Sequence, residues 1–325
     1  MNTTVFKSIA IALSLLPGFV LAQLKNNDWG SPELDQLNKE KPQAAVMLFS
    51  NRQDIGEDNY SRLANTQKNK SKTEDYTLVW ADEFNKEGKP DSADWRYEYG
   101  FVRNEELQWY QPENATCKKG MLIIEAKREQ KINPRYEAGS NDWRKKRETI
   151  EYTSACLLTA GKKTWQYGRF EMRARIDISK GMWPAWWTLG VDKRWPGNGE
   201  IDIMEYYRGK LLANIACLGN EHKPQWFSNT FQTDSLGGAA WANQFHIWRM
   251  DWTEEFIALY CDDQLVNKVD LALLENKDGS GFNPFKQPHY MLLNLAIGGQ
   301  NGGDASATEF PKHFEVDYVR VYQKK

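Results

Sequence analysis

The sequence predicts an all-β fold, a β-sandwich that occupies residues 76–325. Short runs rich in β-branched and aromatic residues alternate with turn residues throughout this region, a pattern typical of sandwiches and barrels. Helical periodicity extends over no useful length, with residues 271–274 as a short exception. The chain of 325 residues is long enough for one large all-β domain or for two smaller ones, with an ample core.

The predicted strands follow one another at short intervals. The clearest alternation covers residues 170–177, where the even-numbered positions are expected to face the core. Residues 247–266 indicate a meander, with a tight turn at Asp262 and Asp263. The other expected strands are at residues 121–127, 152–157, 212–217 and 314–323. Residues 128–148 are expected to be a charged loop whose basic cluster is a solvated tip, or else contacts an acidic or sulfated glycan.

Residues 1–22 are organised like a secretory signal peptide. Lys7 provides the positive start, an apolar run follows, and Ala22 is a small residue at the expected cleavage position. The apolar run is too short to span a membrane comfortably. We therefore expect a secreted or periplasmic protein without a membrane span. Residues 23–75 are polar and charged, and we expect an N-terminal arm and linker there, ahead of the sandwich.

Four cysteines are spread through the predicted sandwich at long intervals, and export would permit disulfides between them. Four cysteines allow three disulfide connectivities, and the sequence does not choose among them. No CxxC spacing is present, which argues against a zinc site. Because a core of this size needs no cross-links, we expect most of Cys117, Cys156, Cys217 and Cys261 to be buried thiols.

Composition narrows the partners of the chain. The net charge of −2 gives no general electrostatic argument for binding nucleic acid or an anionic membrane. A surface of this kind suits a neutral polysaccharide. Aromatic residues make up 13% of the chain, and the 14 Trp residues lie partly in clusters beside acidic residues.

Three carboxylates stand close together in residues 199–206: Glu200, Asp202 and Glu205. The Ile and Met residues between them indicate a buried strand. Since side chains alternate along a strand, Glu200 and Asp202 share one face and Glu205 points the other way. A β-bulge, one extra residue between Asp202 and Glu205, would bring Glu205 round to the same face.

Two carboxylates on one rigid strand suit retaining glycoside hydrolysis, which needs a nucleophile and a general acid/base about 5–5.5 Å apart. An acid between them can share a proton with the nucleophile and separate the two pKa values. A solvated acidic strand face or an acidic cation site would show the same spacing. The flanking sequence is needed to decide between these interpretations.

Four tryptophans precede this stretch, at Trp183, Trp186, Trp187 and Trp195. Flat apolar rings stack on sugar faces, and indole N–H groups donate hydrogen bonds. A Trp-rich core is the alternative, but the Pro and Gly residues among these tryptophans argue against uniform burial. The combination of tryptophans and carboxylates favours a sugar-binding site.

The motif Trp183-Pro184-Ala185-x-Trp187, followed by Glu200-Ile201-Asp202-Ile203-Met204-Glu205, resembles glycoside hydrolase family 16 in its bulged E-x-D-x-x-E form. That form is typical of laminarinase-like endo-β-glucanases, agarases and porphyranases. Similar stretches extend over the whole of residues 76–325 and include residues 80–84, 104–110, 167–171, 245–248, 293–299 and 316–322. The resemblance implies a concanavalin A-like jelly roll with an open concave substrate cleft.

The resemblance also implies roles for the three carboxylates. Glu200 is expected to be the nucleophile and Glu205 the general acid/base, with Asp202 supporting Glu200. His246 is expected to be a structural histidine, because the acid pair is sufficient for catalysis. No cofactor is expected for catalysis.

Substrate-binding residues are expected around the carboxylates. Trp183 and Trp187 are the best candidates for stacking on sugar rings. Asn104 and Glu105 are expected to hydrogen-bond sugar hydroxyls, although a simple turn role is equally compatible with Asn104. Two more residues complete the expected site, Trp109 beside them and Asn294 on the cleft floor.

A structural calcium ion on the convex face is common in the family, and the matching positions here are Glu83, Gly120 and Asp317. Oxygen ligands of this kind suit calcium. An ordinary outward polar residue in the last strand is the alternative for Asp317. We expect the protein to be a monomer.

The implied function is a secreted, retaining endo-β-glycanase that acts on β-1,3- or mixed β-1,3/1,4-glucan. Many laminarinase-like members carry a histidine where Ala216 lies here, so a galactose-containing chain such as a mucin-type O-glycan, agarose or porphyran is the alternative. A non-catalytic glycan-binding module is a further alternative, although such a module has no need of both Glu200 and Glu205. Residue types do not separate hydrolysis from transglycosylation.

Overall fold

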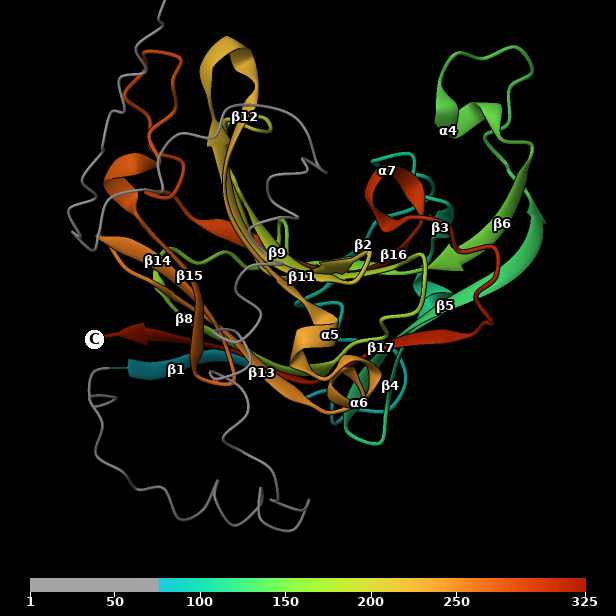
Figure 1. The fold of residues 1–325 in the computed structure, drawn as a ribbon, viewed down its shortest axis with the longest axis horizontal. Coiled ribbons are helices and arrows are strands. Elements are labelled where there is room, and N and C mark those ends of the chain that lie inside the picture. Colours follow the sequence, from blue (N-terminus) through green and yellow to red (C-terminus); the bar gives the residue numbers. More distant parts are fainter. Residues whose placement is uncertain (1–75) are drawn as a thin grey trace, which may run out of the picture. The chain divides into compact units, whose positions relative to one another are not determined.

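The computed structural model describes residues 76–325, and the predictions of a signal peptide, arm and linker in residues 1–75 lie outside the described residues. Within the described part, no helix is long and apolar enough to cross a membrane. The described residues form mainly β-strands, which are arranged in two sheets stacked as layers (Figure 1). The predicted all-β sandwich is confirmed.

One layer is a seven-stranded antiparallel sheet in the order β12-β11-β10-β9-β16-β7-β2. Its strands are β2 (Arg96–Tyr97), β7 (Cys156–Leu158), β9 (Met182–Gly190), β10 (Glu200–Tyr207), β11 (Lys210–Leu218), β12 (Pro224–Gln232) and β16 (His289–Ile297). The sheet therefore places β16 beside β9, although about a hundred residues of chain separate them.

The second layer is a ten-stranded sheet in the order β15-β14-β13-β8-β17-β5-β6-β3, with β1 paired to β17 and β4 paired to β5. Its strands are β1 (Tyr76–Asp82), β3 (Gln108–Tyr110), β4 (Ala115–Lys118), β5 (Met121–Ile132), β6 (Thr149–Ser154), β8 (Gly168–Arg175), β13 (His246–Trp252), β14 (Phe256–Cys261), β15 (Gln264–Asp270) and β17 (Lys312–Lys324). Both sheets draw strands from distant parts of the chain, as a jelly roll does.

The core lies between the two sheets and follows from the side-chain pattern. Strand β8 alternates as predicted, with Phe170, Met172 and Ala174 fully buried. Strand β11 is buried at eight of its nine positions, because one face meets the other sheet and the strand is flanked by β10 and β12.

Several element boundaries differ from the prediction. Strand β5 continues to Ile132, five residues beyond the predicted end, because its pairing with β6 extends it through charged positions. The single strand expected at residues 152–157 is two strands, β6 and β7, which belong to different sheets on either side of Ala155. Short helices also occur where none was predicted: α4 (Trp143–Lys146), α5 (Thr233–Leu236), α6 (Gly238–Ala242) and α7 (Gly299–Gly302). Elements of four or five residues are too short to show a helical period.

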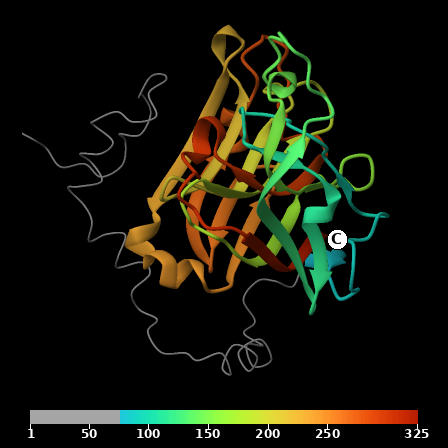
Figure 2. The ribbon, with the colours of Figure 1, turned by 90° about the vertical axis from the view of Figure 1, so that its right-hand side faces the viewer.

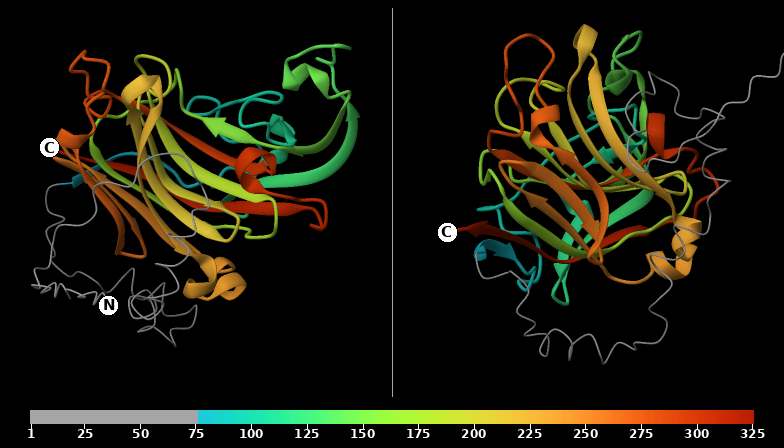
Figure 3. Two further views of the ribbon diagram at one scale, coloured as in Figure 1. Left: turned by 45° about the horizontal axis from the view of Figure 1, so that its top comes forward. Right: turned by 60° about the vertical axis from the view of Figure 1, so that its left-hand side comes forward.

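Strands β5 and β6 extend beyond the sheet as a long hairpin whose tip carries α4. We call residues 128–149 the β5–β6 arm; Figure 2 shows it toward the viewer, and Figure 3 (left) shows it rising from the sandwich, as the β11–β12 hairpin also does. Arg144 of the arm donates to the backbone oxygen of Val102, and Arg147 donates to those of Glu105 and Glu106. The arm is therefore fixed to the segment that contains Asn104 and Glu105.

The four cysteines are all free and buried, as predicted. Cys117 lies on β4 and Cys261 on β14, while Cys156 lies on β7 and Cys217 on β11. Burial raises the pKa of the Cys117 thiol to about 12 and that of Cys217 to about 11. The fold is stable through its core rather than through cross-links.

Candidate active site

The pairing of β10 contains the predicted bulge. Toward β11, Asp202 pairs with Asn214 and Glu205 pairs with Leu212, so the register shifts by one residue between them. The pairing of β10 with β9 shifts at the same place. A bulge of this kind re-aims the side chains that follow it.

The bulge brings the three carboxyls onto one face. Ile203 and Met204 are consecutive, and both side chains belong to the core between the sheets. Glu205 therefore lies on the opposite face, together with Glu200 and Asp202. We call this the outer face, meaning the face of the seven-stranded sheet that points away from the ten-stranded sheet. The prediction of a continuous row of acids is confirmed.

The carboxyls of Glu200 and Asp202 are hydrogen-bonded to each other. Burial raises the pKa of both groups, and the neighbouring charges of Glu200 and Glu205 raise that of Asp202 well above its usual range. The indole N–H of Trp195 donates to Glu200 Oε2 and favours the ionised form of Glu200. Asp202 therefore keeps a proton that it can share with an ionised Glu200.

The carboxyl of Glu205 has two neutral donors. Trp183 Nε1 donates to Oε1 at 2.7 Å, and Asn214 Nδ2 donates to Oε2 at 3.0 Å. Burial raises the pKa of Glu205 to about 8, the charge of Glu200 adds to the rise, and the two N–H groups oppose it. At neutral pH this side chain is a proton donor with a fixed direction.

The two tryptophans predicted to stack on sugars lie on the outer face but are largely buried. Trp183 is 5% exposed and Trp187 is 8% exposed, and the N–H of Trp187 donates to Asn294 Oδ1. Trp186 is fully buried as well, but Trp195 is not, so burial of the four tryptophans is not uniform, as expected. Trp195 is 48% exposed and donates to Glu200, so its ring is the most exposed of the four.

The predicted binding residues Asn104 and Glu105 form a turn whose backbone has positive φ at both positions, 53° and 50°. The amide of Asn104 donates to the buried carboxylate of Glu106 at 3.2 Å, while the side chain of Glu105 is exposed. We call these two residues the 104–105 turn. Its shape comes from contacts with distant parts of the chain, namely the arm on one side and Gln300 N, which donates to Asn104 O, on the other.

Trp109 and Asn294 occupy different surroundings. Trp109 is half-buried, meets Phe101 edge-on and carries the guanidinium of Arg135 over its ring at 5.2 Å. This stack ties the β5–β6 arm to β3. Asn294 is buried on β16, where it orients Trp187. The sugar contacts predicted for both residues stay predictions.

Three residues of the site were not among those predicted from the sequence: Arg103, Glu106 and Asn214. Trp195 was noted as one of the four tryptophans before the acids but was not chosen as a stacking residue. Arg103 bonds to Glu98 and lies over the ring of Trp187 at 5.1 Å. Glu106 is 2% exposed and accepts hydrogen bonds from Asn104, Gln108 and Tyr110.

The sequence does contain a signal for Asn214. Arg208 and Gly209, both with positive φ, form the tight turn between β10 and β11. Counting back from this turn, with one residue added for the bulge, places Asn214 opposite Asp202. The same count places Ala216 opposite Glu200, and Ala216 is fully buried. No comparable local count exists for Arg103 or Glu106, which lie on a loop.

His246 is structural, as predicted, because both ring nitrogens are occupied. Nδ1 lies 2.6 Å from Asp262 Oδ2, and Nε2 lies 2.8 Å from the backbone oxygen of Trp241. His246, Cys261 and Asp262 hold three potential metal-ligand atoms within 4.8 Å of one another. The ring thus joins the start of β13 to the β14–β15 turn through Nδ1 and to α6 through Nε2.

The positions predicted for calcium have other partners in the structure. Glu83 forms a two-pronged ion pair with Arg320, and Asp317 forms an ion pair with Arg173 at 2.7 Å. The two carboxylates thus already neutralise arginines, so their charge does not favour a calcium ion. Gly120 lies in the turn between β4 and β5. The calcium site stays a prediction.

A separate hollow of about 730 Å³ lies where β5 separates from β17. Its lining includes Lys127, Arg128 and Glu129 from the arm and Phe310 and Pro311 from the segment before β17. Arg128 is held there by the backbone oxygens of residues 305 and 306. None of the three outer-face carboxyls belongs to this lining, so the hollow is not the candidate active site.

Known proteins resemble the chain along most of its length. A β-glucanase of Rhodothermus marinus is 37% identical over 264 residues, which cover 76% of this chain and 85% of the relative. A keratan-sulfate endo-1,4-β-galactosidase of Sphingobacterium multivorum is 27% identical over 257 residues, 77% of this chain and 56% of the relative.

Solved structures also resemble the chain over most of its length. One is described among the endo-acting O-glycanases with which prominent members of the human gut microbiota initiate mucin breakdown. It superimposes with a TM-score of 0.70 at 34% identity, covering 77% of this chain and 91% of the other. The sequence model of glycosyl hydrolases family 16 matches residues 108–320, which include every strand from β3 to β16. The chain belongs to glycosyl hydrolases family 16.

Proposed function

We propose that this family 16 endo-β-glycanase is exported and cleaves internal β-linkages of a polysaccharide with retention of configuration. Glu200 is the nucleophile, Glu205 is the general acid/base, and Asp202 supports Glu200. The observation that carries the proposal is the bulge in β10, which gathers the buried Asp202 and the partly exposed Glu200 and Glu205 on one face. Retaining hydrolysis needs two carboxyls about 5–5.5 Å apart with separate pKa values, and the presence of two carboxyls on one face of one strand supports this mechanism.

In the first step, protonated Glu205 gives its proton to the glycosidic oxygen while ionised Glu200 attacks the anomeric carbon. The glycosidic bond breaks, and a glycosyl ester forms on Glu200. In the second step, ionised Glu205 takes a proton from water, and the water oxygen attacks the anomeric carbon. The ester breaks, Glu200 leaves as a carboxylate, and Asp202 stabilises that charge through their hydrogen bond.

For the substrate we favour a galactose-containing chain of the mucin O-glycan type. Ala216 lies opposite Glu200, where its methyl group offers no polar contact to a sugar near the cleavage point. The structural similarity to an O-glycanase and the sequence similarity to an endo-β-galactosidase support the same choice. β-1,3- or mixed-linkage glucan is the second candidate, because the β-glucanase relative shares 37% identity.

Product analysis on laminarin, mixed-linkage β-glucan, agarose, porphyran and mucin O-glycans tests the substrate. Oligosaccharides from mucin O-glycans but not from laminarin are the expected result. Release from laminarin or mixed-linkage glucan would instead identify a β-glucanase that tolerates Ala216. Products longer than the substrate would indicate transglycosylation, and binding without any product would indicate a glycan-binding module.

The role of Glu200 is tested by Glu200→Gln, with Glu275→Gln as a matched control at an exposed glutamate far along the chain. We expect Glu200→Gln to lower kcat by at least about 10³-fold while it still binds glycan. Glu275→Gln should behave as wild type. The early anomer of the product, followed by NMR, should have the configuration of the substrate. Continued cleavage by Glu200→Gln would show that the assignment of roles is wrong.

A further inference from the structure

Asn214 lies on β11, directly opposite Asp202, and is only 1% exposed. Its single amide nitrogen donates to two carboxyls: to Asp202 Oδ2 at 3.1 Å and to Glu205 Oε2 at 3.0 Å. An amide nitrogen has two hydrogens, so both donors of Asn214 are used by the acid row. The bulge makes this possible, because it leaves Asn214 level with Asp202 while Glu205 turns back toward it.

The other end of the same amide is unusual. Asn214 Oδ1 is buried and has no hydrogen-bond partner among the described residues. Burying an unpaired acceptor costs free energy, so a position with a purely structural role would be better filled by an apolar side chain. Its neighbours on the same face of β11, Leu212 and Ala216, are apolar and buried. The buried oxygen of Asn214 therefore costs stability, while the amide nitrogen of the same group bonds to the acid row.

From these contacts we propose that Asn214 is a positioning residue that joins the supporting acid Asp202 to the acid/base Glu205. The inference rests on the proposed function. One donor group between two carboxyls fixes their separation and favours the ionised form of each. Asn214 thereby lowers the pH above which the enzyme loses its acid, in opposition to the larger effect of burial.

Other groups also act on this pair. Glu200 and Tyr207 come from β10 itself, and Trp183 comes from β9. Glu106 faces Glu205 from the segment that precedes β3, and Arg103 of that segment acts on Glu200. Of these, only Trp183 donates a hydrogen bond to Glu205, and none bonds to both Asp202 and Glu205. Asn214 is thus the direct link.

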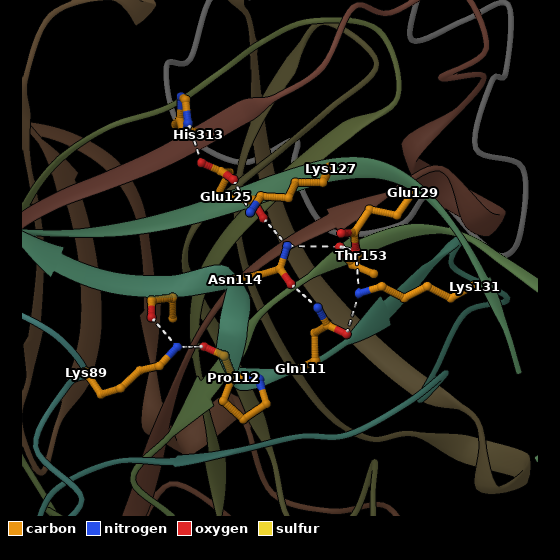
Figure 4. Close-up of polar contacts among 11 residues, drawn as sticks. Lys89, Gln111, Pro112, Asn114, Glu125, Lys127, Glu129, Lys131, Thr153 and His313 are labelled. Carbon is orange, nitrogen blue, oxygen red and sulfur yellow. Dashed lines mark hydrogen bonds and ion pairs between the residues drawn. The ribbon is translucent and has the colours of Figure 1, made fainter. Parts of the chain in front are cut away.

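The test compares Asn214→Leu with Asn114→Leu, a matched change at a buried asparagine outside the site. Figure 4 shows Asn114, whose amide likewise donates twice, to Glu125 O at 2.7 Å and to Thr153 Oγ1 at 3.0 Å. Its oxygen also accepts a hydrogen bond, from Gln111 Nε2 at 2.8 Å. Asn114 is therefore fully paired, and its role is structural.

Kinetics are measured on whichever of laminarin, mixed-linkage β-glucan and mucin O-glycans the wild-type chain cleaves fastest. Asn214→Leu removes the donor that favours ionised Glu205, so Glu205 keeps its proton to higher pH. We expect kcat to fall roughly tenfold or more with KM nearly unchanged. We also expect the alkaline limb of the pH–rate profile to move to higher pH. The melting temperature should fall less than in Asn114→Leu, which should keep both limbs in place.

A profile of Asn214→Leu with an unmoved alkaline limb would overturn the inference, as would a loss of activity explained entirely by lower stability. A second variant, Asn214→Asp, keeps the shape but adds a carboxyl between two others, and we expect its activity to be lower still. The Glu200→Gln variant distinguishes an error in the proposed function from an error in the role of Asn214. If Glu200→Gln is inactive and Asn214→Leu has the wild-type profile, only the role of Asn214 is wrong.

Discussion

The acid row on β10 and the 104–105 turn are held in place by different means. The acid row lies in the middle of a sheet, where β9 and β11 pair with β10 on both sides. The 104–105 turn has positive φ at both residues and depends on Arg147 of the arm and on Gln300 N. Strand pairing therefore holds the proposed catalytic carboxyls in place, whereas long-range contacts hold the residues that are proposed to bind sugar.

This difference separates two kinds of sensitivity. A change in the acid row should alter the chemical step, because the neighbouring strands keep the backbone in place whatever the side chain is. A change in the contacts of the 104–105 turn should alter substrate affinity, because each non-glycine residue with positive φ is held there at a cost in free energy. The next four predictions test this separation, from the largest expected effect to the smallest.

Replacing Glu205 should have the largest effect. Glu205→Ala removes the proton donor, so we expect kcat at neutral pH to fall by about 10²–10⁴-fold. The alkaline limb of the profile, which reports loss of that proton near pH 8, should disappear. Azide should restore turnover on an activated substrate by attacking the glycosyl ester. If the pH–rate profile of the variant kept its complete alkaline limb, Glu205 would not be the general acid.

Glu205 should also lower the free energy of unfolding at high pH. The pKa of Glu205 is 4.5 as a free side chain and about 8 in the fold, so between these values the native chain holds a proton that the unfolded chain has lost. Native stability therefore falls as pH rises through this window. Glu205→Gln should be more stable than wild type above pH 8, on the order of 2–5 kcal/mol, and equal to it below pH 4. Thermal melts at pH 4 and pH 9 measure the difference.

Loss of Arg147 should affect binding rather than chemistry. Arg147→Ala removes the hydrogen bonds to Glu105 O and Glu106 O, so we expect KM to rise roughly tenfold with kcat changed little. Lys146→Ala removes the same charge from the preceding residue, the last of α4, and the Lys146 side chain has no ion pair or hydrogen bond among the described contacts. It serves as the control. An equal rise in KM for both variants would mean that the loss of positive charge, and not the loss of contacts with the 104–105 turn, weakens binding.

The smallest effect is expected at Trp195. Trp195→Phe keeps an aromatic ring but loses the N–H that donates to Glu200. Because that N–H favours ionised Glu200, its loss should move the acid limb of the profile to higher pH and leave the alkaline limb unchanged. The rate at the optimum should fall by less than about tenfold. A shift of the alkaline limb instead would show that Trp195 acts on Glu205.

The acid row could be predicted from the sequence because its determinants are local. Spacing along one strand and the need for a bulge gave the arrangement of Glu200, Asp202 and Glu205. The family resemblance then supplied the proposed roles. The burial of Trp183 and Trp187 was missed, because burial depends on what other segments place over a ring.

The structure of the β5–β6 arm also depends on distant segments that the local sequence does not reveal. Its charged sequence was predicted to be a loop, yet pairing with β6 extends β5 into its first five residues, and arginines stack on aromatic rings from another segment. Charge alone does not reveal such partners. The contact of Arg147 with the 104–105 turn joins residues more than forty positions apart, a separation that no spacing rule covers.

The reactivity of the four buried thiols can be used to follow the unfolding of the two sheets. Two lie in each sheet: Cys117 and Cys261 in the ten-stranded sheet, and Cys156 and Cys217 in the seven-stranded sheet. A buried thiol of raised pKa reacts slowly with alkylating reagents until its strand is exposed to solvent. Mass spectrometry after brief labelling in rising denaturant would therefore show whether the two layers separate together or one before the other, with no probe added to the chain.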